Sequence, residues 1–135
     1  MDAVQVKTLQ DPMEPYNLSQ AFRVGDLVIT SGQVAISPAG ELVGVGDFDA
    51  QATQVFANLA EVLEAAGSSL AQVIKVTIYL TDMANFPKIV GLREQYFSAP
   101  YPADTIVEVK SLALPELEIE IEATALRGGA TRPAG

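Results

Sequence analysis

The sequence predicts a single α+β domain, in which one mixed β-sheet carries two helices on the same face. Three observations lead to this prediction. The hydrophobic patterns follow the order strands, helix, strand, helix, strands, and two helices can cover only one face of a sheet. The 135 residues suffice for one core, and a content of 49% hydrophobic and 19% charged residues is typical of a globular chain. We expect the domain to span residues 1–126 and residues 127–135 to form a flexible tail.

A hairpin and a turn are predicted first along the chain. The segment 22–36 is rich in β-branched and apolar residues, and a Gly-Asp pair and a Ser-Gly pair interrupt it, as expected of a hairpin. Pro38 and Gly40 then predict a turn over residues 37–42. The G-x-G at residues 44–46 lacks the third glycine of a dinucleotide-binding fingerprint, so it indicates a turn before a helix.

Two helices are predicted, at about residues 49–66 and 86–98. In the first, apolar residues recur at steps of three and four and form one stripe: Val55, Phe56, Leu59, Val62 and Leu63. Asp47 or Asp49 can cap its start, and Gly67 suits its end. A short helical turn is expected at residues 69–72. The core face of the second helix is predicted to consist of Ile89, Val90, Tyr96 and Phe97.

Three further strands are predicted at residues 73–80, 105–109 and 117–126. In the first of these, the alternation points four apolar side chains inward: Ile74, Val76, Ile78 and Leu80. In the last, Glu118, Glu120 and Glu122 alternate with apolar residues, so three carboxylates are expected on the sheet face without helices. That face is either solvated or packed against other subunits.

Composition excludes several classes of function. Seventeen acidic and eight basic residues give a net charge of −9, and no run of Lys or Arg is present, so nucleic acid and anionic membranes are poor partners. The absence of His and Cys excludes Ser-His, Cys-His and zinc sites, so no metal is expected. The chain has no apolar run long enough to span a bilayer and no signal-peptide pattern, which together predict a cytoplasmic protein.

Three blocks of sequence resemble the Rid family, also called YjgF. They are SQAFRVGDLVITSGQVAI, AQATQVFANLAEVLEAAGSSLAQVIKVTIYLTDMANF and EIEIEATA, and the resemblance extends from about Ser19 to Ala125. It implies a chorismate-mutase-like two-layer fold, assembled as a homotrimer with a ligand cleft at each subunit interface. Archetypal members hydrolyse enamines and imines, such as 2-aminoacrylate derivatives, to keto acids and ammonia. They use no cofactor and no metal.

The resemblance also implies site residues. Glu120 corresponds to the cleft carboxylate that holds or activates the attacking water. Ser31 corresponds to the cleft serine, and Gly32 beside it would let a ligand approach the backbone closely. Tyr16 corresponds to the N-terminal tyrosine, although the inserted Asn-Leu pair leaves open whether Tyr16 or Leu18 lines the cleft. From the residues alone, Ser31 and Gly32 can equally mark the end of a strand.

The largest departure from the family lies at residues 102–105, where P-A-D-T replaces P-A-R-[ST]. Asp104 thus stands in place of the arginine that clamps the substrate carboxylate, and Ile106 follows as a further substrate-binding position. Two carboxylates, Asp104 and Glu120, would repel an anionic imino acid, so we expect little hydrolysis of such substrates. The pair could instead form an acid/base pair or favour a neutral or cationic ligand, or Asp104 could merely cap or face solvent. Val90 replaces the asparagine of the second helix.

Three hypotheses of function follow. The first is a cofactor-independent hydrolase for a substrate without the usual carboxylate, which uses Glu120 with Asp104. The second is a non-catalytic trimer that binds a small metabolite in a regulatory role. The third, nucleic-acid work, rests on an older family label of endoribonuclease and is the weakest because the chain is acidic. Arg23, Arg93 and Lys110 could supply the missing cation, but no spacing places them at the cleft.

Overall fold

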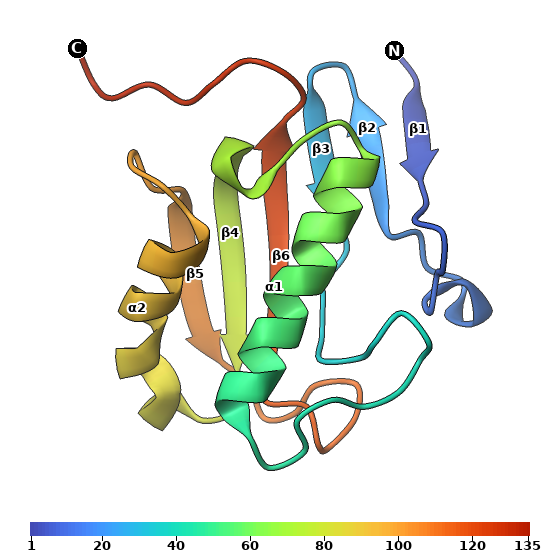
Figure 1. The fold of residues 1–135 in the computed structure, drawn as a ribbon, viewed down its shortest axis with the longest axis vertical. Coiled ribbons are helices and arrows are strands. Elements are labelled where there is room, and N and C mark those ends of the chain that lie inside the picture. Colours follow the sequence, from blue (N-terminus) through green and yellow to red (C-terminus); the bar gives the residue numbers. More distant parts are fainter.

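A six-stranded mixed sheet carries both helices on one face (Figure 1). The computed structural model describes all residues, 1–135. The strands are β1 (Ala3–Val6), β2 (Ala21–Val24), β3 (Leu27–Thr30), β4 (Val73–Leu80), β5 (Ala103–Glu108) and β6 (Ile119–Leu126), and the helices are α1 (Phe48–Ala65) and α2 (Phe86–Tyr96). The strand order is β1-β2-β3-β6-β4-β5, in which only β4 and β5 are parallel. The predicted α+β, two-layer architecture is therefore confirmed.

The core lies between the helices and the sheet. The apolar stripe of α1 is buried as predicted, and Asp47 caps the helix by accepting a hydrogen bond from the Ala50 N–H at 3.1 Å. The ring of Phe56 stacks on Tyr96, with centroids 4.1 Å apart, and meets Phe97 edge-on at 5.7 Å. These aromatic contacts join α1 to the end of α2, each adding about 1 kcal/mol beyond area burial.

Several details differ from the sequence prediction. Val90 is 52% exposed rather than part of the core, and in α2 only Ile89 is fully buried. A β-bulge between Val73 and Lys75 shifts the register of β4 against β6, so Val73 is buried and Ile74 is only half-buried. The strand β1 was not predicted, because four residues at the sheet edge give too short a pattern. The helical turn near residue 70 is present as a short 3-10 helix.

The sheet face that points away from the helices, which we call the open face, is partly apolar. Phe22 and Ile29 form a cross-strand pair on it, with exposed fractions of 39% and 50%. On β6 it carries Glu120 and Glu122, and the hydroxyl of Tyr79 on β4 donates to Glu122 at 2.6 Å. None of the helices is long and apolar enough to cross a membrane.

The expected row of three carboxylates is reduced to two. Glu118 precedes β6, and its carboxylate contacts the buried amide of Gln51 on α1 at 3.3 Å. The same amide accepts from the Glu118 N–H at 2.8 Å and donates to the carbonyls of Glu116 and Gly44. Gln51 therefore links α1 to the start of β6 and satisfies the backbone there. Its position within the apolar stripe of α1 is the only sequence signal that could have revealed it.

Candidate functional site

Glu120 lies on β6 next to Tyr79 of β4, half-buried, with no protein group donating to its carboxylate. Burial raises the pKa of the Glu120 carboxyl above its ordinary value of 4.5, and the nearby charge of Glu122 raises it further. Glu122 is held by Tyr79, and that hydrogen bond together with burial raises the pKa of the Tyr79 hydroxyl. Glu120 is therefore the free carboxylate of the two, with a pKa displaced towards neutrality, as expected of a general acid or base.

Gly32 allows the Glu120 carboxylate to lie directly against the backbone. A Cβ atom at position 32 would overlap Oε2 of Glu120 and come within 2.7 Å of its Cδ. The φ angle of Gly32 is not positive, so the glycine is required here for space and not for conformation. Any larger residue would displace the carboxylate.

Ser31 follows β3 directly and is hydrogen-bonded to the backbone. Its hydroxyl donates to the Ser19 carbonyl at 2.5 Å, and its N–H donates to the Gln20 carbonyl at 2.9 Å. Both bonds tie the end of β3 to the segment before β2. Ser31 thus fixes the backbone beside Gly32, and its hydroxyl oxygen keeps a lone pair for a ligand.

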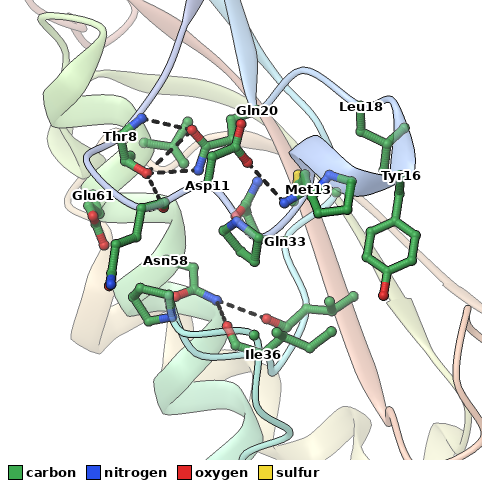
Figure 2. A pocket seen from close by; sticks show the side chains of 18 of the residues that line it. Thr8, Asp11, Met13, Tyr16, Leu18, Gln20, Gln33, Ile36, Asn58 and Glu61 are labelled. Atoms are coloured by element: carbon green, nitrogen blue, oxygen red, sulfur yellow. Dashed lines mark hydrogen bonds between the residues drawn. The ribbon is translucent and has the colours of Figure 1, made fainter.

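A pocket of about 710 Å³ lies between the N-terminal loop, the loop after β3 and α1 (Figure 2). Tyr16, Leu18, Gly32 and Glu120 all line it, so both Tyr16 and Leu18 contribute to the pocket that contains Glu120. Tyr16 is 76% exposed, and its ring projects from the N-terminal loop.

Hydrogen bonds hold the two loops that form this pocket. The side chain of Gln20 exchanges two bonds with Thr8, accepting from its N–H at 2.8 Å and donating to its hydroxyl at 2.9 Å. From α1, Asn58 donates to the carbonyls of Val34 and Ile36 at 3.0 and 2.8 Å. The charged residues that line the pocket are Asp11, Glu61 and Glu120, without any Lys or Arg. The field in the pocket is therefore negative.

Asp104 and Ile106 do not join Glu120 within one chain. The register of β4 and β5 pairs them with the buried Val76 and Ile78, so they face the helices, whereas Glu120 is on the open face. Asp104 and Glu120 therefore do not form a close pair within one chain, and a pair across a subunit interface, as the resemblance implies, stays a prediction. The register of β5, which the sequence alone does not specify, separates them within the chain.

Asp104 is also not a free negative charge. Nε of Arg93 on α2 donates to Oδ2 of Asp104 at 2.9 Å. Arg93 is thus the cation at this position, whereas Arg23 is on β2 and Lys110 is exposed beyond β5. A second hollow of about 300 Å³ lies here, lined by Val90, Arg93, Glu94, Tyr101 and Pro102. No group of three or more acidic side chains converges in a way that could hold a metal ion.

Comparisons with known proteins agree with the resemblance. The model of the family described as Endoribonuclease L-PSP matches residues 7–127. A RutC family protein of Pyrococcus horikoshii is 45% identical over 117 residues, which cover 86% of this chain and 90% of the relative. A protein of the mite Dermatophagoides farinae named 2-iminobutanoate/2-iminopropanoate deaminase is 34% identical over 111 residues, 82% of this chain and 84% of the relative.

Solved structures show the same fold. RidA from an Antarctic Psychrobacter species superimposes with a TM-score of 0.82 at 36% identity, covering 90% of this chain and 98% of RidA. The yeast protein YEO7 superimposes with a TM-score of 0.86 at 34% identity, covering 94% of this chain and all of the yeast chain. The chain therefore belongs to the Rid (YjgF) family, whose matching model carries the description Endoribonuclease L-PSP.

Proposed function

We propose that the protein is a cofactor-independent hydrolase of imines and enamines that acts as a homotrimer, with its clefts between neighbouring copies. The observation that carries this proposal is the half-buried Glu120 carboxylate, which has a raised pKa, no donor of its own and a glycine against it. The similarity to a mite protein named as an imine deaminase supports the same reaction class.

Hydrolysis of an imine needs one group that moves protons in both directions. Water adds to the imine carbon and gives up a proton, and the C–N bond of the resulting carbinolamine then breaks as the nitrogen gains a proton. The products are a carbonyl compound and ammonia, so one water is consumed and no oxidant or reductant is involved. A carboxyl with a raised pKa can accept the proton from water and return it to the departing nitrogen. Glu120 is the residue for both transfers.

A cleft between two copies would join the two separated groups of site residues. Tyr16, Gly32 and Glu120 line one pocket of a chain, while Asp104 and Ile106 face α2 on the other side of its sheet. Each group is half of the predicted site, so a second copy would complete it. The apolar residues of the open face, which no part of the chain covers, support such an assembly.

The second candidate function is a trimer that binds a metabolite without turnover. The observation in its favour is that the Ser31 hydroxyl already donates to the Ser19 carbonyl, so its proton is not available to a substrate. Such a protein would bind keto acids or their analogues without releasing ammonia.

The test is ammonia release from 2-iminobutanoate generated in situ from 2-aminobutanoate by an amino acid oxidase. The wild type should release ammonia above the spontaneous rate, and Glu120→Gln should lower kcat/KM by roughly 100-fold or more. Gly32→Ala should lower it as well while the melting temperature stays near that of wild type, because the methyl group displaces the carboxylate.

Glu64→Gln is the control, because Glu64 is an exposed carboxylate on α1 that does not line the pocket. Equal ammonia release by Glu120→Gln and wild type would contradict the proposal. Keto-acid binding without any ammonia release would favour the second candidate.

A further inference from the structure

Two neighbouring carboxylates on the open face have different surroundings. Glu120 and Glu122 lie two positions apart on β6, so both side chains point to the same side of the sheet. The hydroxyl of Tyr79 donates to Oε1 of Glu122 at 2.6 Å, whereas no group of the chain donates to the carboxylate of Glu120. The fold therefore distinguishes two acids that the alternation of the strand places in equivalent positions.

Tyr79 bonds to the more distant of the two acids in the strand register. Its register partner on β6 is Glu120, while Glu122 lies opposite Thr77 and is the diagonal neighbour of Tyr79. An aromatic side chain can reach a diagonal neighbour across an antiparallel pair. A tyrosine has one O–H to donate, so the bond to Glu122 leaves Glu120 without a donor from this residue.

This choice of partner has an electrostatic consequence. A hydrogen bond donated to a carboxylate favours its charged form, so Tyr79 holds Glu122 as an anion. The pKa of the Glu120 carboxyl is raised first by burial and then by that neighbouring charge. The Tyr79–Glu122 pair thus acts on Glu120 without touching its carboxylate.

Few other charged groups face the two acids. On the open face, β3 and β5 place only uncharged side chains, and Nζ of Lys75 on β4 donates to the Thr105 hydroxyl at 2.7 Å. Of all the charges around it, only that of Glu122 contributes to the raised pKa of the Glu120 carboxyl. The N-terminal loop and α1 add the remaining titratable groups of the pocket: Asp11, Tyr16 and Glu61.

We infer that Tyr79 and Glu122 are positioning residues that select Glu120 as the acid/base group of the site. The inference rests on the proposed function, in which Glu120 takes a proton from water and returns it to the departing nitrogen. With Tyr79 bonded to Glu122, one acid is a fixed anion and the other is free to exchange a proton. A phenol that donated to Glu120 instead would favour the anion there and make it a weaker base.

A purely structural role for the pair would look different. The backbone ladder already joins β4 to β6 along the whole of both strands, so the side-chain bond adds little to their pairing. A neutral acceptor at position 122 could take the same hydrogen bond without repelling Glu120. The chain instead keeps a second charge beside a half-buried carboxylate, which costs stability and strengthens the base.

Titration of the glutamate carboxyl carbons by NMR tests the inference without any need for turnover. Loss of a signal in Glu120→Gln identifies the Glu120 carboxyl, which in wild type should titrate above pH 4.5 in one step. Glu122→Gln removes the charge but keeps an acceptor for Tyr79, so the midpoint of the Glu120 titration should fall. Tyr79→Phe should spread that titration over two steps, because a proton can then bind either carboxylate.

Glu118→Gln is the matched control. It removes the third carboxylate of the same alternation, which contacts Gln51 on the helix side of the sheet. The Glu120 titration should stay where it is in this variant. A Glu120 midpoint that does not move in Glu122→Gln, or that moves equally in Glu118→Gln, would overturn the inference.

The pH profile of kcat/KM for 2-iminobutanoate connects the pair to the reaction. Glu122→Gln should move the acidic limb to lower pH and lower the plateau severalfold, because Glu120 becomes a weaker base. Tyr79→Phe should lower kcat/KM severalfold at the acidic limb, and should change nothing when added to Glu122→Gln, because Tyr79 acts through Glu122.

The outcomes separate this inference from the proposed function. Equal effects of Tyr79→Phe in the two backgrounds, with ammonia release that still depends on Glu120, would overturn the inference and leave the proposed function standing. The expected NMR shifts in a protein that releases no ammonia would support the selection of Glu120 as the proton-exchanging group and contradict the proposed hydrolysis.

Discussion

Glu120, the proposed catalytic residue, lies where its ionised form is disfavoured. Its carboxylate is half-buried against Gly32, beside the charge of Glu122, and nothing in the chain donates to it. Its raised pKa means that ionised Glu120 is less favourable in the folded protein than in the unfolded chain. A residue under this cost that lines a pocket is typical of an active site.

Replacing Glu120 by glutamine should therefore raise the melting temperature at pH 7. The folded pKa is above the ordinary value of 4.5, so ionisation of Glu120 costs stability at any pH above the folded pKa. Below pH 4.5 the carboxyl is protonated in both states and the cost disappears. Calorimetric melting from pH 4 to pH 8 should show the advantage of Glu120→Gln shrinking as the pH falls. A lower melting temperature of the variant at pH 7 would show that an ionised Glu120 stabilises the fold.

At the scale of elements, α1 is the main support of the sheet, and its buried stripe includes Val62, which is 2% exposed. Val62→Asp should lower the free energy of unfolding by about 4 kcal/mol, because the new carboxylate would be buried without a partner. That is a large part of the 5–15 kcal/mol typical of a domain. Chemical denaturation is the measurement. Ala57→Asp places the same charge on an exposed position of α1 and should lower the free energy of unfolding only slightly. Equal losses of stability in the two variants would refute the assignment of Val62 to the buried stripe.

Elements with a strong period were predictable from the sequence, and those that depend on tertiary register were not. The bounds of α1 and β4 differ from the prediction by at most one residue, because the period of 3.6 or 2 extends over several turns or pairs. Val90 was placed wrongly because α2 buries only Ile89 completely and has a weak apolar face. The Arg93–Asp104 pair was out of reach, since it depends on the rotation of α2 and on the register of β5.

Family motifs extended the prediction to the site, but only in part. Glu120 and Gly32 lie together as the motifs indicate. The expected repulsion by Asp104 took no account of Arg93 as its partner, because no sequence spacing placed any of the three candidate cations there. A motif identifies which residue stands at a position, whereas the fold determines which charged residue pairs with it.

At the scale of the whole molecule, the open face should be covered by neighbouring copies. No helix covers this face, yet it exposes three large apolar side chains, Phe22, Ile29 and Val107, each 38–50% exposed. Such an apolar surface is typical of a contact between proteins. Light scattering should give about 43 kDa, three times the 14.3 kDa of one chain. Ile29→Arg should lower the mass without unfolding the protein, since the side chain points away from the core. A mass near 14.3 kDa for wild type would refute the trimer.

The central claim is a hydrolytic site built from two copies of the chain, and subunit complementation tests it most directly. Glu120→Gln and Arg93→Gln/Asp104→Asn are each expected to be nearly inactive as homotrimers on 2-iminobutanoate. When the two variants are co-expressed and mixed trimers are purified, each mixed trimer places an intact Glu120 opposite an intact Arg93–Asp104 pair at about one third of its interfaces. The account predicts ammonia release at about one third of the wild-type rate. Mixed trimers no more active than the two separate variants would contradict it.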